Sequence, residues 1–138
     1  MERQSQQLII PTGYEDLLES TALAHVATLG PHGKPQSNSV WFDWDGEHVK
    51  FSQTQTPQKY RNLQRDPRIA LSIGDPESPY RYLEIRHEVT RVEVDLNIDF
   101  INSMAKKYLG LDKYPYHQPG DERIIVFVRP EHTTQMGA

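Results

Sequence analysis

The sequence of 138 residues contains no cysteine. Disulfide bonds, thiolate zinc sites, cysteine-bound iron–sulfur clusters and a cysteine nucleophile are therefore excluded. Apolar side chains are also scarce, and hydrophobic residues make up only 36% of the chain. Ordinary soluble domains contain about 45–50% on a closely similar count. The length fits one domain with a small core, so the shortage raises the question whether a single chain is complete without a partner.

Long apolar runs and an excess of basic residues are missing as well. Fifteen lysines and arginines stand against nineteen acids, a net charge of −4, whereas nucleic-acid-binding domains are usually basic. No run approaches the ~18 apolar residues that cross a bilayer, and the N-terminal MERQSQQ lacks the apolar core of a signal peptide. We therefore expect a cytoplasmic protein without nucleic-acid or membrane partners. It should form one domain, 1–138, with a loose N-terminal segment over about 1–10.

Familiar catalytic and metal-binding motifs are absent too. The six histidines are scattered, and none has HxH or HExxH spacing. No serine lies in a G-x-S-x-G elbow, and neither G-x-G-x-x-G nor a Walker loop occurs. We expect no metal site, and a phosphate site would have to form without a glycine-rich loop.

Alternating or continuous apolar stretches, bounded by turn residues, predict six strands. They cover 22–29, 34–44, 47–54, 68–73, 80–94 and 123–130. The first three follow one another as an antiparallel meander, with a tight turn at Asp45-Gly46. The fifth is long enough to bend or to serve two packing surfaces.

Cap and stop residues predict three short helices. One covers 14–20 behind Thr12, and a second starts at Pro57 and ends before Pro67. A third follows Asp95 and ends at Gly110. Strands with inserted helices, rather than alternating βαβ units, predict a mainly β (α+β) fold, a six-stranded antiparallel barrel with short helices.

The start of the second helix is unusual. Helix N-termini favour acidic side chains, but this first turn carries Gln58 and Lys59 instead. A cation there is favourable when an anion meets both the cation and the helix dipole. An anion site and a solvated basic helix face explain this pattern equally well.

Two strand faces offer further candidates. Trp41 and Trp44, in SNSVWFDW, could line the pocket of a flat ligand or simply pack in the core. In YRYLEIR, the side chains of Tyr80, Tyr82, Glu84 and Arg86 share one strand face. Such an amphipathic stripe suits a subunit interface, and a solvated face is the alternative.

Several motifs in order resemble one known family. They are HVATLGPHGKPQSNSVWF, KFSQTQTPQKYRNLQRDPRIALSI, DPESPYRYLEIR, AKKYLG and PGDERIIVFVRPE. Over about 22–130 the chain resembles the flavin-binding split β-barrel superfamily of pyridoxamine-phosphate oxidase, and within it the deazaflavin reductases that use coenzyme F420. The resemblance implies an FMN-binding split-barrel fold and a homodimer with the cofactor at its subunit interface.

The resemblance also implies site residues. Lys59, followed by Asn62-Leu63 and Asp66-Pro67, stands where the superfamily binds the cofactor phosphate. The ring system would lie against Asn38-Ser39-Val40 and Ser52-Gln53-Thr54. The full expected set of cofactor-binding residues is Asn38, Ser39, Val40, Ser52, Gln53, Thr54, Gln58, Lys59, Asn62 and Tyr82.

The expected activity is hydride transfer from reduced F420 to an electron-poor or conjugated small organic acceptor. Members that oxidise pyridoxamine phosphate with FMN carry basic residues where this chain has Asn38 and Asp43, which disfavours that cofactor and activity. His87 stands where close relatives usually have glycine. The alternatives are an FMN-dependent oxidoreductase of the same fold and a cofactor or haem carrier without turnover. No residue is indicated as the general acid.

Overall fold

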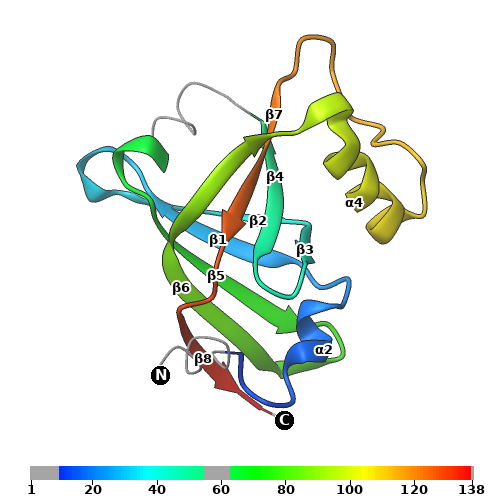
Figure 1. Ribbon diagram of the computed structural model, residues 1–138. Coiled ribbons are helices and arrows are strands. Elements are labelled where there is room, and N and C mark those ends of the chain that lie inside the picture. The colour runs from blue at the N-terminus through cyan, green and yellow to red at the C-terminus, as the bar shows by residue number, and fades with distance from the viewer. Residues whose placement is uncertain (1–9, 55–62, 138) are drawn as a thin grey trace.

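The computed structural model describes residues 10–54 and 63–137 (Figure 1). Its strands are β1 (Ala24–Leu29), β2 (Pro35–Val40), β3 (Phe42–Trp44), β4 (Val49–Thr54), β5 (Arg68–Asp75), β6 (Ser78–Val94), β7 (Arg123–Val128) and β8 (His132–Met136). The helices are α2 (Glu15–Leu18) and α4 (Asp99–Leu109), with 3-10 turns η1 (Pro31–Gly33) and η2 (Leu96–Ile98).

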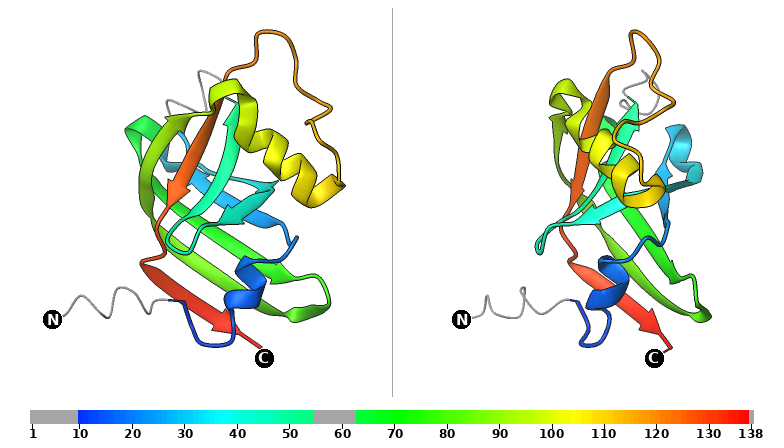
Figure 2. Two further views of the ribbon diagram at one scale, coloured as in Figure 1. Left: turned by 45° about the vertical axis from the view of Figure 1, so that its right-hand side comes forward. Right: turned by 90° about the vertical axis from the view of Figure 1, so that its right-hand side faces the viewer.

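All strand pairs are antiparallel, in the order β2-β1-β5-β6-β7-β4-β3, and β8 pairs with β6. The sheet curls into a half-barrel, with α2 near one end and α4 near the other (Figures 1 and 2). The first part of β6 pairs with β5 and β8, and its last part pairs with β7. The long strand therefore serves two parts of the sheet, and the mainly β split-barrel fold is confirmed.

The described residues form eight strands rather than the expected six. The segment 34–44 is divided at Trp41 into β2, which pairs with β1, and β3, which pairs with β4. The three strands expected as one meander therefore belong to two parts of the sheet, β1 and β2 in one part and β3 and β4 in the other. The sequence pattern also missed β8, because the short polar segment HTTQM gains its partner only from distant β6.

The core lies on the inner face of the curled sheet, where alternate strand residues point. Phe42, Phe51, Leu71, Leu83 and Ile85 are at most 1% exposed. Leu17 and Leu18 of α2 join them and close one end of the barrel. Fully burying each large side chain contributes about 1.5–3 kcal/mol to stability.

The helices differ from expectation mainly in their ends. Helix α2 is shorter than 14–20 and has no side-chain cap. Helix α4 ends as expected at Gly110, whose φ of 75° is left-handed. The predicted helix that starts at Pro57 falls largely outside the described residues. Its described part includes residues 63–65, which are helical. No helix among the described residues is long and apolar enough to cross a bilayer.

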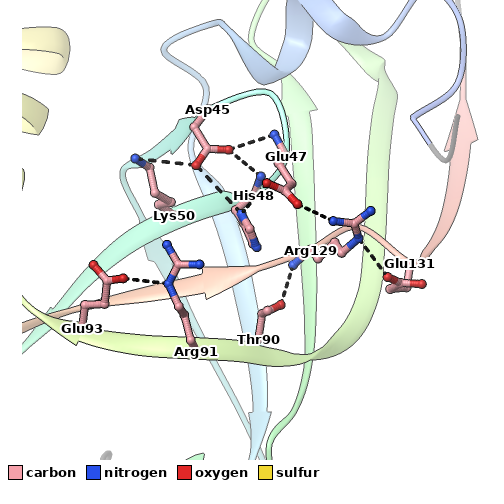
Figure 3. A network of polar contacts seen from close by, with 9 residues as sticks. All are labelled: Asp45, Glu47, His48, Lys50, Thr90, Arg91, Glu93, Arg129 and Glu131. Carbon is pink, nitrogen blue, oxygen red and sulfur yellow. Dashed lines mark hydrogen bonds and ion pairs between the residues drawn. The ribbon is translucent and has the colours of Figure 1, made fainter. Parts of the chain in front are cut away.

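The expected Asp45-Gly46 turn joins β3 to β4 within a polar network (Figure 3). The Asp45 carboxylate accepts the backbone N–H groups of Glu47 and His48 at 2.8 and 2.6 Å. Arg129, just after β7, pairs with Glu47 at 2.6 Å and with Glu131 at 3.2 Å. These contacts attach the turn to the neighbouring end of β7.

Candidate functional site

A cavity of about 390 Å³ lies between strands β2 and β4, helix α4 and the loop that leads to β7. Its lining residues are Leu23, Ser39, Val40, Trp41, Ser52, Ile101, Tyr114, Tyr116 and Arg123. This volume falls in the range of small-molecule sites, and the lining combines aromatic and apolar surfaces with a few polar groups.

Three of the expected ring-binding residues meet at this cavity, namely Ser39 and Val40 of β2 and Ser52 of β4. Asn38 and Gln53 lie on the opposite strand faces from their neighbours Ser39 and Ser52, because strand side chains alternate. Neither lines the cavity. Strand β2 thus contributes two consecutive residues at its end, Ser39 and Val40, and β4 contributes Ser52.

Other expected residues lie elsewhere. Thr54 pairs with Arg123 at the end of β4 but is not part of the cavity lining. Tyr82 lies on β6 opposite Gly74 and Met136, in the other part of the sheet. Gln58, Lys59 and Asn62 lie outside the described residues.

One wall of the cavity is formed by the aromatic rings of Trp41, Tyr114 and Tyr116, and Tyr108, which is not a lining residue, packs on Trp41. The indole of Trp41 stacks on Tyr108, with ring centroids 5.2 Å apart and an interplanar angle of 12°. Its other contact is edge-on with Tyr114 at 5.9 Å, and Tyr114 meets Tyr116 edge-on at 5.6 Å. These rings hold one another in defined orientations, as flat-ligand recognition requires.

The Tyr108 hydroxyl joins α4 to the break between β2 and β3. It donates to the carbonyl of Ala22 at 2.7 Å and accepts the N–H of Phe42 at 3.1 Å. Burial raises the pKa of Tyr108 to about 12. The hydroxyl therefore stays protonated near neutral pH and serves to hold the chain where Trp41 leaves the strand.

Lys107 supports the same break. Its ammonium donates to the Phe42 carbonyl at 2.7 Å and lies 3.9 Å from the Asp43 carboxylate. Burial lowers the pKa of Lys107, and the nearby Asp43 charge opposes that shift. Lys107 is thus engaged in structure, whereas the neighbouring Lys106 is exposed.

Arg123 is the cation that lines the cavity. One terminal nitrogen, Nη1, lies 3.4 Å from Ser52 Oγ, and the guanidinium lies over the Tyr114 ring at 4.7 Å. The Nε atom is buried without a hydrogen-bond partner among the described residues. A buried donor in this position favours a ligand that carries a hydrogen-bond acceptor.

A further polar contact belongs to Ser39, whose Oγ lies 3.2 Å from His25 Nδ1 on the neighbouring strand. Within 10–54 and 63–137, no group of three or more histidine, cysteine, aspartate or glutamate residues could hold a metal ion. The site therefore offers hydroxyls, aromatic rings and one guanidinium.

The sequence pattern did not point to Tyr108, Tyr114 or Arg123 as site residues. Tyr108 follows the apolar spacing of α4, which indicates packing. Arg123 opens an apolar strand immediately after two acids, which is typical of an exposed strand end. The sequence does show a cation at the start of a buried strand. It does not show which residues lie beside that cation, because the strand register determines its neighbours across the sheet.

Comparison with known proteins gives a consistent result. The family model described as pyridoxamine 5′-phosphate oxidase matches residues 10–137. A solved structure named F420 reductase is 41% identical, with 91% of this chain and 98% of that chain covered and a TM-score of 0.80. No curated protein matches the chain.

More distant structures share the fold. A conserved hypothetical protein of Mycobacterium tuberculosis is 22% identical, with a TM-score of 0.68 over 93% of this chain and 86% of that chain. General stress protein 26 of Bacillus anthracis is 15% identical, with a TM-score of 0.65 over 96% and 94%. At these identities the likeness concerns the fold alone.

Proposed function

Because the chain belongs to the pyridoxamine 5′-phosphate oxidase family, we propose that it is an F420-dependent oxidoreductase that passes a hydride to an electron-poor or conjugated organic acceptor. The family and the neighbour named F420 reductase point to an oxidoreductase with a flavin-like cofactor. The observation that carries the proposal is the cavity in which Ser39 and Ser52 face an aromatic wall.

The residues present suit a flat cofactor ring. Small hydroxyl side chains from β2 and β4 leave room beside the backbone, and the described lining contains no carboxylate to repel an anionic ring system or acceptor. The unpartnered Arg123 Nε–H adds a donor for a ring or acceptor oxygen. Reduced deazaflavin, when bound, would supply the hydride.

The protein's own task is then orientation and exclusion of water. Ser39, Val40 and Ser52 orient the ring, while Trp41 and Tyr114 cover the other side of the cavity with apolar surface. Tyr108 is not the proton donor, because its hydroxyl already serves two backbone groups and its pKa is raised to about 12. No described side chain is assigned that role.

Lys59 is the proposed ligand of the cofactor phosphate, together with Gln58 and Asn62. This assignment rests on the family resemblance and on the first-turn cation in the sequence. These residues follow Thr54 within eight positions, and Thr54 is the last residue of the strand that contributes Ser52 to the cavity. A phosphate beside the ring site is therefore within reach of the segment.

We propose a homodimer as the working form. The strand register places Tyr82, Glu84 and Arg86 on the outer face of the sheet. The cross-strand row Glu84, Ser72, His25 and Ser39 lies on that same face. A second subunit bound to this face would therefore meet the cavity at Ser39, and would cover the amphipathic stripe together with the edge of the cofactor site.

FMN is the alternative cofactor. The chain has Asn38 and Asp43 where FMN-dependent oxidases carry basic residues, and the Asp43 carboxylate lies near Lys107. This charge pattern favours a deazaflavin. Purified protein distinguishes the cases: a yellow flavin spectrum would support FMN, a Soret band would support a haem carrier, and colourless protein that shifts the fluorescence of added F420 supports our proposal.

The decisive experiment measures F420 binding and the oxidation of reduced F420 in the presence of quinones, enones, nitroaromatics and tetrapyrroles. Lys59→Ala should weaken F420 binding by about 10- to 100-fold, the loss of a charge-assisted hydrogen bond to an anion. Lys34→Ala, an exposed lysine after η1, is the matched control. If Lys59→Ala binds F420 with unchanged affinity, Lys59 is not the phosphate ligand. If none of the acceptors oxidises reduced F420 in the presence of the protein, the proposed activity is wrong.

A further inference from the structure

Arg123 has no close counter-ion in the described chain, unlike most of the other described arginines. Five of them have a carboxylate oxygen within 4.0 Å of a guanidinium nitrogen, and these are Arg68, Arg81, Arg86, Arg91 and Arg129. Within residues 10–54 and 63–137, no carboxylate lies that close to Arg123. A half-buried guanidinium without a counter-ion suits an external anion.

Among the described residues, Arg123 has one buried donor without a partner, its Nε–H group. Nη1 is directed to Ser52 Oγ at 3.4 Å, whereas the Nε–H group is buried and has no partner in the described chain. A carboxylate can accept from Nε and a terminal nitrogen together, which is the strongest geometry available to arginine. The cost of burying the unpaired Nε–H would be recovered on binding.

Charge decides on which side of Arg123 the anion binds. A second cavity, of about 400 Å³, also borders Arg123 and is lined by Asp95, Asp121 and Glu122. Their carboxylates repel an anion. The cavity with Trp41 has no acidic lining residue in the described chain, so an anion is favoured there.

The surroundings of Arg123 also select the shape of the ligand. Tyr114 lies against the guanidinium on one side and edge-on to Trp41 on the other. Leu23 and Ile101 complete the apolar lining. These surfaces suit a planar conjugated body whose polar end reaches Arg123.

We propose that the Arg123 end of this cavity, beside the ring assigned to Ser39 and Val40, binds a flat conjugated acceptor that carries a carboxylate, and that Arg123 recognises this carboxylate through its unpaired Nε–H edge. The inference rests on the proposed function insofar as the ligand is the hydride acceptor. It narrows the acceptor from any electron-poor molecule to conjugated carboxylic acids.

Two probes of the same shape test the proposal, 4-nitrobenzoate and its uncharged analogue 4-nitrobenzamide. Both are titrated into the full-length protein without deazaflavin, at fixed ionic strength, and quenching of tryptophan fluorescence reports binding beside Trp41. The native protein should prefer the carboxylate by about tenfold or more. Arg123→Gln should weaken 4-nitrobenzoate binding by roughly 10- to 100-fold and change 4-nitrobenzamide binding less than about threefold.

Two further variants complete the test. Arg123→Lys keeps the charge but not the planar fork, and should lose part of the preference for the carboxylate. Arg129→Gln alters an arginine beyond the other end of β7, paired with Glu47 and Glu131, and should change neither affinity. Circular dichroism checks that each variant is folded. If Arg123→Gln does not fold, the comparison of Arg123→Lys with the native protein tests the proposal.

Equal affinity of the native protein for the two probes would overturn the proposal. An equal loss of affinity for both probes in Arg123→Gln would also overturn it, because that pattern indicates a structural role of Arg123. The outcome is independent of the cofactor assignment, since no deazaflavin is present. Deazaflavin oxidation without an Arg123-dependent preference would remove this inference and leave the proposed function intact.

Discussion

The ring of Tyr108 stacks on the indole of Trp41 with centroids 5.2 Å apart, and its hydroxyl bonds the backbone of Phe42, directly after that tryptophan's strand break, and of Ala22, just before β1. One side chain of α4 thus determines both the orientation of Trp41 and the path of the chain from β2 to β3. The cavity wall is consequently coupled to the docking of the helix.

Tyr108→Phe keeps the stacked ring but removes the hydroxyl contacts to Ala22 and Phe42. We expect the free energy of unfolding to fall by about 1–3 kcal/mol, because a buried backbone N–H and carbonyl lose a partner. Urea denaturation measures the change. Tyr116→Phe, on an exposed ring, is the control and should change little. Equal stability of the Tyr108→Phe variant and the native protein would contradict the assigned role.

Acid should weaken the attachment of α2 to the β5–β6 hairpin. Arg81, 7% exposed, bonds the Asp16 carboxylate at 2.7 and 3.1 Å and Asp75 at 2.9 Å. The bond from Arg81 lowers the pKa of Asp16, and the N–H of Glu77 followed by Arg81 lowers that of Asp75. Both carboxylates bind protons less readily in the folded state than in the unfolded state. Stability from this pair is therefore present above the ordinary aspartate pKa and lost as pH falls through the lowered values.

Arg81→Met tests this dependence. The native protein should lose stability more steeply than the variant between about pH 5 and pH 2, as urea unfolding at a series of pH values would measure. Arg91→Met, which removes an exposed arginine paired only with Glu93 in the described chain, should leave the steepness unchanged. Parallel curves for the native protein and Arg81→Met would contradict the interpretation.

Asp95 should be needed for α4. Its carboxylate accepts the N–H groups of Phe100 and Ile101 at 2.8 and 3.0 Å. Asp95→Ala leaves these helix-end donors unpaired and should lower the free energy of unfolding by roughly 1–2 kcal/mol. Asp99→Ala, in the same turn but exposed, should have a smaller effect. Chemical denaturation followed by circular dichroism compares them, and equal losses would argue against the capping role.

The proposed dimer predicts a defined effect of Tyr82. A charged residue in the amphipathic stripe would be buried unpaired at a subunit interface, so Tyr82→Arg should raise the dimer dissociation constant by about tenfold or more. Sedimentation velocity over a concentration series measures this. Leu96→Arg alters a more exposed residue, in η2 and outside both the stripe and the cavity lining, and should leave association unchanged. A native monomer that binds F420 with full affinity would contradict the dimer itself.

The strands and α4 followed from the sequence because their apolar periodicity and end signals are local. The expected interval 80–94 became the main part of β6, and Gly110 ended the helix as its left-handed φ requires. The pattern failed at Trp41, where continuous strand propensity hides a break that Tyr108 stabilises from 67 residues further along the chain.

By itself, the sequence excluded thiol chemistry through its lack of cysteine and indicated a small core through its few apolar residues, and its ordered motifs indicated the family. Only the tertiary structure decided which residues meet: the β4–β7 register places Arg123 opposite Thr54, and the cavity lies at the end of β2, where Ser39 and Val40 line it and Asn38 does not. The reason is physical. Periodicity reports which face of an element is apolar, whereas register and packing determine which distant side chains share a cavity.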